Sequence, residues 1–170
     1  MDQTQTLTLH YTPEKNDYIQ VLRIFFLHQT GSRISLGFLV IIFVYMLYNV
    51  ATSAVTVSIF EIILLLFPPV FVAYILFVQP RGIADKAMAN EQLAAETTWE
   101  LGEQGVDIST SFGSTHLNWE DFSRMVTTKE YYLLLIKGNQ RTFRFLPRKV
   151  FTSPQEQDTF LSLVTGHLKK

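Results

Sequence analysis

Cysteine is missing from this chain of 170 residues, and histidine is scarce. The absence of cysteine excludes disulfide bonds, cysteine-ligated zinc, cysteine nucleophiles and thioester-linked lipids. The four histidines, His10, His28, His116 and His167, are scattered singly, so we expect no metal site and no cofactor. An excess of positive charge is also lacking, since the formal net charge is -1, and this argues against nucleic-acid binding.

Charge itself is nearly absent from residues 34–80, where Glu61 is the single acidic or basic side chain. At a rise of about 1.5 Å per residue, residues 34–50 and residues 55–78 can each cross a hydrocarbon core of about 30 Å. Residues 51–54 form a short break between them. The sequence therefore predicts a hairpin of two transmembrane helices.

The distribution of Lys and Arg predicts the orientation of this hairpin. Arg23 and Arg33 precede the first span, Arg81 and Lys86 follow the second, and the connecting loop has neither residue type. Because cytoplasmic flanks carry an excess of these residues, we expect both termini to face the cytoplasm. The polar N-terminus has no basic segment leading into an early apolar run, so we expect no cleaved signal peptide.

The segments that flank the hairpin have their own patterns. Residues 6–11 alternate between apolar and polar side chains, which predicts that residues 1–11 contribute a strand to a soluble domain. Thr12 and Pro13 are typical of a helix start, and residues 13–33 are apolar around most of the circumference, which favours a juxtamembrane helix partly in the headgroup region. We expect a helix break at Pro80 to Gly82 and a short connecting helix within residues 80–96.

From residue 97 onward, short alternating runs are separated by turn residues, which is typical of antiparallel strands. Six strands are expected, at residues 97–101, 106–110, 114–119, 122–128, 131–137 and 142–146. Ser153, Pro154 and Glu156 then predict a capping box at the start of a final amphipathic helix. The expected fold class is α+β, with residues 97–170 forming an antiparallel sheet or barrel closed by this helix. If the N-terminal strand joins it, the layout is that of a pleckstrin-homology-like domain.

Four segments carry a resemblance to a known family: "EQGVDIST", "LNWEDFSRM", "YYLLLI" and "FRFLPRKVF". Together with the order of strand, helix and two-span hairpin, they make the chain resemble bacterial YcxB-like membrane proteins. The resemblance implies a multi-pass protein of the bacterial inner membrane. It implies no catalytic residues, because the family has none to transfer.

The strongest candidate binding residues are the cations Arg141, Arg144, Arg148 and Lys149. Arg144 should point outward between Phe143 and Phe145, and the turn after Pro147 could bring several cations onto a phosphate or a protein partner. Against specific phosphoinositide recognition, the turn at residues 102–105 has no cation. Alternatively, the cluster is a solvated face balanced by nearby acids.

Three further residues are candidates within the hairpin. Glu61 is an ionisable group in an apolar span and could serve a proton pathway, or could simply reach the headgroups near the loop. Pro68 and Pro69 remove two helical amide donors and predict a kink, which serves either packing or a moving part.

Outside the hairpin, Trp119, Glu120 and Asp121 could form an aromatic and acidic site, but a core tryptophan beside a solvated turn is the simpler interpretation.

Three functions are compatible with these patterns. The favoured one is a non-enzymatic membrane protein whose cytoplasmic domain binds a protein partner or a second copy of the chain, as a subunit or regulator of a membrane complex. The second is a sensor of anionic lipid headgroups that uses the basic turn. The third is an accessory component of a transport complex. An enzyme is not expected, because the sequence shows no nucleophile and base pair, phosphate-binding loop or metal-ligand spacing.

Overall fold

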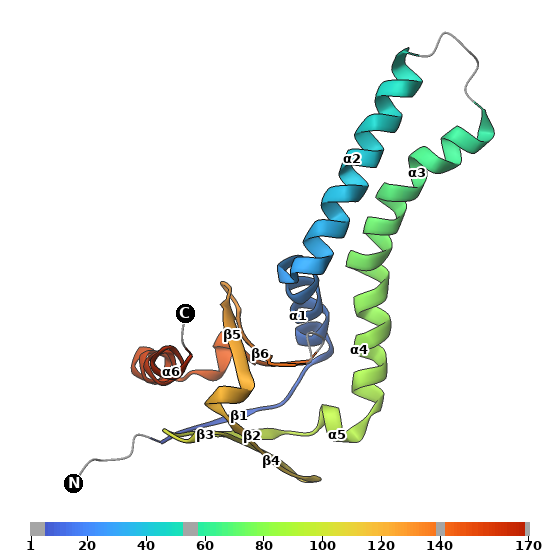
Figure 1. Ribbon diagram of the computed structural model, residues 1–170. Helices are drawn as coiled ribbons and strands as arrows, with labels where there is room; N and C mark the ends of the chain where they lie inside the picture. The colour runs from blue at the N-terminus through green and yellow to red at the C-terminus, as the bar shows by residue number, and fades with distance from the viewer. Residues whose placement is uncertain (1–5, 53–57, 139–141, 169–170) are drawn as a thin grey trace.

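The computed structural model describes residues 6–52, 58–138 and 142–168. A pair of long helices projects from a part that contains the strands (Figure 1). The helices are α1 (Lys15–His28), α2 (Thr30–Thr52), α3 (Ile59–Ala73), α4 (Gln79–Ala89), α5 (Glu91–Ala94) and α6 (Pro154–His167). The strands are β1 (Leu7–Tyr11), β2 (Thr97–Leu101), β3 (Gly105–Thr110), β4 (Gly113–Asn118), β5 (Phe122–Thr127), β6 (Tyr131–Ile136) and β7 (Phe143–Pro147).

The strands form two antiparallel sheets, ordered β1-β2-β3-β4 and β5-β6-β7. The α+β class and the antiparallel pairing are thus confirmed, and of the two alternatives, sheet or barrel, the described strands form sheets and not a closed barrel. Between the two sheets the chain passes through the 3-10 turn Trp119–Asp121, and no strand ladder joins β4 to β5 within the described ranges. Trp119 is 5% exposed and its Nε1 donates to the carbonyl of Gly102 at 2.9 Å, so this turn fixes the point where the chain changes sheets.

Strand β1 lies before the hairpin in sequence and pairs with β2, which lies after it. The register places Leu7 opposite Leu101 and Leu9 opposite Trp99. All four side chains are buried, and the polar residues between them on β1 are exposed. The strand expected at residues 6–11 is therefore present, and it completes the four-stranded sheet.

Helix α1 packs into the core of the strand-containing part. Val21 is fully buried and Phe25 is 7% exposed, and the ring of Phe25 lies 4.8 Å from that of Phe143. Another side of α1 contacts α4. The apolar surface of α1 is thus covered in part, since Leu22 is also buried whereas Leu27 is 43% exposed. Helix α6 packs elsewhere on the core, with the ring of Phe160 5.0 Å from that of Tyr132.

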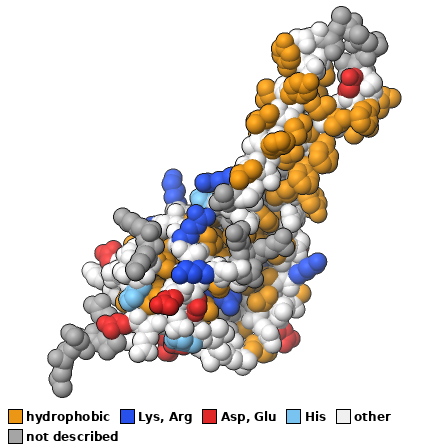
Figure 2. All heavy atoms as spheres, in the orientation of Figure 1, with side chains coloured by type: hydrophobic (Ala, Val, Ile, Leu, Met, Phe, Trp, Pro, Cys, Tyr) orange, Lys and Arg blue, Asp and Glu red, His pale blue; other side chains and the backbone are white. Residues whose placement is uncertain are grey.

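Two helical segments within the described residues are long and apolar enough to cross a membrane, Gly31–Thr52 and Ile59–Ala89, of 22 and 31 residues. They contain most of the expected spans, 34–50 and 55–78, while residues 53–57 lie outside the described part. Their apolar side chains face outward, as for Ile34 at 66% and Ile59 at 78% exposure. Figure 2 shows the resulting apolar surface of the hairpin.

The helix break expected at Pro80 to Gly82 is absent, because the chain continues from α3 through a π-helical turn, Tyr74–Val78, into α4. In an α-helical pattern, Pro80 has no amide hydrogen to donate to the carbonyl of Leu76. Arg23 of α1 supplies the missing donor, with its Nε 2.9 Å from that carbonyl oxygen. Its guanidinium also lies over the ring of Phe77, 5.1 Å from the centroid.

Candidate functional site

A groove of about 630 Å³ lies where α1, α4 and α5 approach the two sheets. This volume is in the range typical of ligand sites, about 300–1,000 Å³. Trp99 and Ile108 contribute from the four-stranded sheet, Phe145 from β7, and Tyr18 and Leu22 from α1. Its lining is thus largely apolar and aromatic, and it takes in both β4 and β7, each of which is the last strand of its sheet.

Arg144 is the cation that lines this groove. The sequence predicts that its side chain points to solvent, but it is half-buried. Its Nε is enclosed and has no hydrogen-bond partner among the described residues. Burial raises the pKa of the Tyr18 hydroxyl, and the nearby charge of Arg144 opposes that effect. The groove therefore holds a positive charge with an unused donor.

Lys149 has acidic partners on the N-terminal side of α1. Its Nζ lies 2.6 Å from Oε1 of Glu14 and 3.4 Å from Oδ2 of Asp17. The hydrogen bond with Glu14 raises the pKa of Lys149. Lys149 thus fastens the turn after β7 to the start of α1.

The surroundings of Arg148 differ from those of Arg144 and Lys149. Its guanidinium lies over the ring of Tyr132, 4.8 Å from the centroid, and its enclosed Nε lacks a hydrogen-bond partner in the described ranges. Arg141 lies outside the described residues. The three described cations of the predicted cluster therefore have separate surroundings, and only Arg144 lines the groove.

Asp17, which was not predicted from the sequence, is a buried carboxylate with 3% of its surface exposed. The hydroxyls of Tyr11 and Tyr131 donate to its two oxygens at 2.7 and 2.9 Å. Burial, and then the bond to Asp17, raise the pKa of both tyrosines well above the usual range, so both stay protonated donors. A signal was present, because Asp17, Val21 and Phe25 follow one another at i, i+4 on a single helix face.

Glu61 caps the start of α3. Its carboxylate accepts from the amide of Ser58 at 2.8 Å, and its own amide donates to the Ser58 hydroxyl at 3.3 Å. Pro68 and Pro69 both lie inside α3, which bends along its length (Figure 1). Pro68 is buried and Pro69 is exposed. None of these contacts brings Glu61 together with the prolines.

The other predicted polar positions are built into turns. Asp121 accepts from the amide of Asn118 at 2.8 Å and so caps the turn that holds Trp119. At the start of α6, the Ser153 hydroxyl accepts from the amide of Glu156, as the capping box predicts. The reciprocal half differs, because the carboxylate of Glu156 accepts from both the amide and the hydroxyl of Thr152, each at 2.8 Å.

Comparison with known proteins identified a family model that matches part of the chain. The model of the family described as YcxB-like protein matches residues 101–164, from the last residue of β2 into α6. A search of curated proteins found no match. The two apolar helices lie on the N-terminal side of the matched region, in the order that the sequence motifs predicted. The chain therefore carries a YcxB-like region at residues 101–164, and its resemblance to this family is confirmed.

Proposed function

We propose that the protein is a non-enzymatic integral membrane protein of the bacterial inner membrane that presents a cytoplasmic pleckstrin-homology-like domain to a protein partner. The apolar hairpin supports the anchoring role. Side chains such as Ile34, Phe38 and Ile59 are at least 66% exposed, and a hydrocarbon environment would cover them. The excess of Lys and Arg on the flanks of the hairpin supports a cytoplasmic location for both ends.

The arrangement of the strands supports the pleckstrin-homology-like assignment. A four-stranded and a three-stranded antiparallel sheet are followed by one C-terminal helix, α6. The core runs through both sheets and includes Phe160 of α6. Such a scaffold hosts many functions, so the proposal depends on the groove and not on the fold.

The observation that carries the proposal is the charge of Arg144, which has no ion-pair partner within the described residues and lines an aromatic groove that takes in two edge strands. An extended peptide could pair with the outer edge of β4 or β7, neither of which has a second strand partner among the described strands, while its apolar side chains contact Trp99 and Phe145. A carboxylate on that peptide would pair with the guanidinium of Arg144, which lines the groove. We therefore propose that the partner supplies an extended segment that carries an acidic group.

Anchoring is tested by alkaline carbonate washing of membranes that contain the full chain, followed by protease treatment of sealed vesicles from either side. An integral protein with both ends in the cytoplasm stays in the pellet and loses its C-terminal part only when the cytoplasmic face is accessible. Release by carbonate would contradict the anchoring, and cleavage from the opposite face would contradict the orientation.

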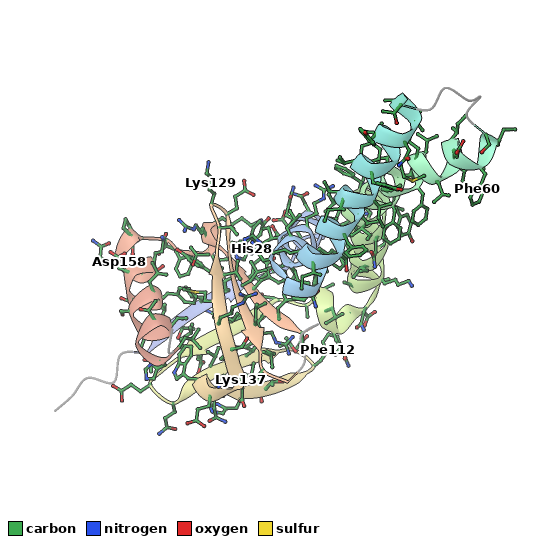
Figure 3. The ribbon with its side chains drawn as sticks, turned by 45° about the horizontal axis from the view of Figure 1, so that its top comes forward. His28, Phe60, Phe112, Lys129, Lys137 and Asp158 are labelled. Carbon is green, nitrogen blue, oxygen red and sulfur yellow. The ribbon has the colours of Figure 1, made fainter. Side chains whose placement is uncertain are left out.

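Partner binding is tested with a photo-crosslinking amino acid placed at Phe112, which lines the groove, in the full chain in its native membrane. Lys129 is the control position, since Figure 3 shows these two residues at opposite ends of the strand-containing part. The crosslinked segment is identified by mass spectrometry and made as a synthetic peptide.

We expect the peptide to contain an acidic group and to bind at least about tenfold more weakly to an Arg144→Gln variant, because a charge-assisted hydrogen bond is lost. An Arg81→Gln variant, altered at an exposed cation on α4, is the matched control and should bind normally. Equal crosslinking from Phe112 and Lys129, or equal peptide affinity for both variants, would contradict the proposal.

A further inference from the structure

A second cavity, of about 350 Å³, lies between the C-terminal end of α1 and the three-stranded sheet. Phe25 of α1, Val126 of β5 and Leu133 of β6 give it an apolar floor, and each of them is at most 8% exposed. Arg124, Lys137 and His28 contribute the basic side of its lining. This cavity therefore combines hydrocarbon-like walls with cationic groups.

Hydrogen bonds connect the lining of this cavity to the chain at the start of α2, where the hairpin begins. Arg124 donates from Nη2 to the carbonyl of His28 at 3.0 Å, and His28 lies two residues before α2 begins. The Nε of Arg33, in the first turn of α2, donates to the carbonyl of Leu27 at 2.9 Å. Figure 3 shows His28 between the strands and the hairpin. With α2 in a membrane, this cavity lies at the depth of the lipid headgroups.

The charge around the cavity has one sign. Its lining contains Arg124 and Lys137 and, among the described residues, no acidic side chain. Neither cation takes part in an ion pair within the described part of the chain, in contrast to Lys149, which has two acidic partners. Figure 2 shows Lys and Arg side chains gathered where the apolar hairpin meets the rest of the molecule.

We propose that this cavity binds one anionic phospholipid from the cytoplasmic leaflet. Its phosphate is held by Arg124 and Lys137, and part of its hydrocarbon contacts Phe25, Val126 and Leu133. This site differs from the basic turn, where Arg148 lies over the ring of Tyr132 and Lys149 forms an ion pair with Glu14. The inference rests on the proposed membrane anchoring, because only an inserted hairpin brings the cavity to the headgroups.

The test uses the full chain in nanodiscs made of phosphatidylcholine with a minor share of phosphatidylglycerol. Lipids that remain bound after extraction into mild detergent are counted by native mass spectrometry. We expect the wild type to retain one phosphatidylglycerol. An Arg124→Gln, Lys137→Gln variant should bind it about 25-fold more weakly, since each cation at an anionic surface contributes about fivefold.

A Lys15→Gln, Lys129→Gln variant is the matched control, because both residues are exposed cations that neither flank the hairpin nor line the cavity, and it should retain the lipid. An Arg124→Lys variant keeps the positive charge and should retain the lipid. The melting temperatures of the variants and the wild type show whether a loss of lipid comes from lost binding or from unfolding. Equal retention of phosphatidylcholine, or unchanged retention by the Arg124→Gln, Lys137→Gln variant, would overturn the lipid site alone. Failure of the wild type to insert would overturn both the site and the anchoring.

Discussion

Asp17 connects the N-terminal part of the chain to two segments that lie far from it in the sequence, β6 and the turn after β7. Its carboxylate, on α1, accepts from Tyr11 of β1 and Tyr131 of β6, and Lys149 lies within 3.4 Å. A buried carboxylate is costly unless its oxygens are hydrogen-bonded, and here both are. Asp17 therefore holds α1, the helix that precedes the hairpin, against both sheets.

Replacing Asp17 by alanine should destabilise the protein, because the hydroxyls of Tyr11 and Tyr131 lose their acceptor in a buried environment. Each unsatisfied buried group costs about 1–3 kcal/mol, so the free energy of unfolding should fall by about 2–6 kcal/mol in chemical denaturation. The exposed ion pair of Lys15 with Asp85 offers the control, since Asp85→Ala should cost less than about 1 kcal/mol. Similar small losses in both variants would show that the Asp17 network contributes little.

His116 gives a pH-dependent prediction at an exposed site. Its Nδ1 lies 2.7 Å from Oδ1 of Asp107, and this hydrogen bond raises the pKa of His116 above 6.5. Because the pKa is raised in the folded state, the pair stabilises the fold fully below pH 6.5 and its contribution is lost as the pH rises through the folded pKa. An NMR titration should show a lower pKa for His116 in an Asp107→Asn variant, and an unchanged value would contradict the assignment.

For single residues, the helix caps were predictable from the sequence, and the side-chain partners contributed by other segments were not. Ser153 and Trp119 have local or compositional signals, and their roles as cap and core residue were predictable. The separate environments of Arg144, Arg148 and Lys149 depend on α1, which lies far from them in the sequence, and on the preceding strand β6. A cationic cluster in one short segment therefore does not reveal which of its members are already partnered.

At the scale of elements, the link between α1 and the second long helix carries the clearest prediction. Arg23 donates to the carbonyl of Leu76, which Pro80 leaves without its α-helical donor. An Arg23→Met variant should lose about 1.5–3 kcal/mol of stability, because it removes a charged donor from that carbonyl.

A Pro80→Ala substitution restores an amide at this position, so the two changes should be coupled. In the Pro80→Ala background, Arg23→Met should cost less than it does alone, by about 1 kcal/mol or more in a double-mutant cycle. Thermal unfolding in detergent provides the four stabilities. Strict additivity would mean that Arg23 does not compensate for the proline.

The strands were predictable at the scale of elements, and their arrangement was not. Alternation of side chains places β2, β5 and β6 within one residue of their expected limits. Alternation does not say which strands pair, so the division into two sheets at Trp119 had no signal in the pattern. The prediction of a helix break at Pro80 was wrong for a related reason, since the donor that compensates for the proline, Arg23, comes from another helix.

At the scale of the whole molecule, β1 should be indispensable for the part that follows the hairpin. A fragment of residues 97–170 lacks Leu7, Leu9 and Tyr11, which are buried in the core. Burial of one large apolar side chain contributes about 1.5–3 kcal/mol, and their sum approaches the total stability of a domain, about 5–15 kcal/mol. We expect this fragment to aggregate or to lack a cooperative thermal transition.

The control is a chain in which a Gly- and Ser-rich linker replaces the membrane-facing part of the hairpin, residues 35–72, so that β1, α1 and α4 are retained. Since α1 and α4 contact each other directly, this chain should remain soluble and unfold cooperatively. A cooperative transition in the fragment of residues 97–170 would show that β1 is dispensable.

The pairing of β1 with β2 also has a consequence for biosynthesis. A ribosome releases β1 and α1 first, and both must wait until the hairpin and then β2 have been made. In the proposed topology, the two strands meet only if both long helices enter the bilayer, because a single crossing would leave them on opposite sides. Completion of the four-stranded sheet would thus act as a proofreading step, in which a chain inserted with the wrong number of crossings keeps an unfinished, protease-sensitive sheet edge.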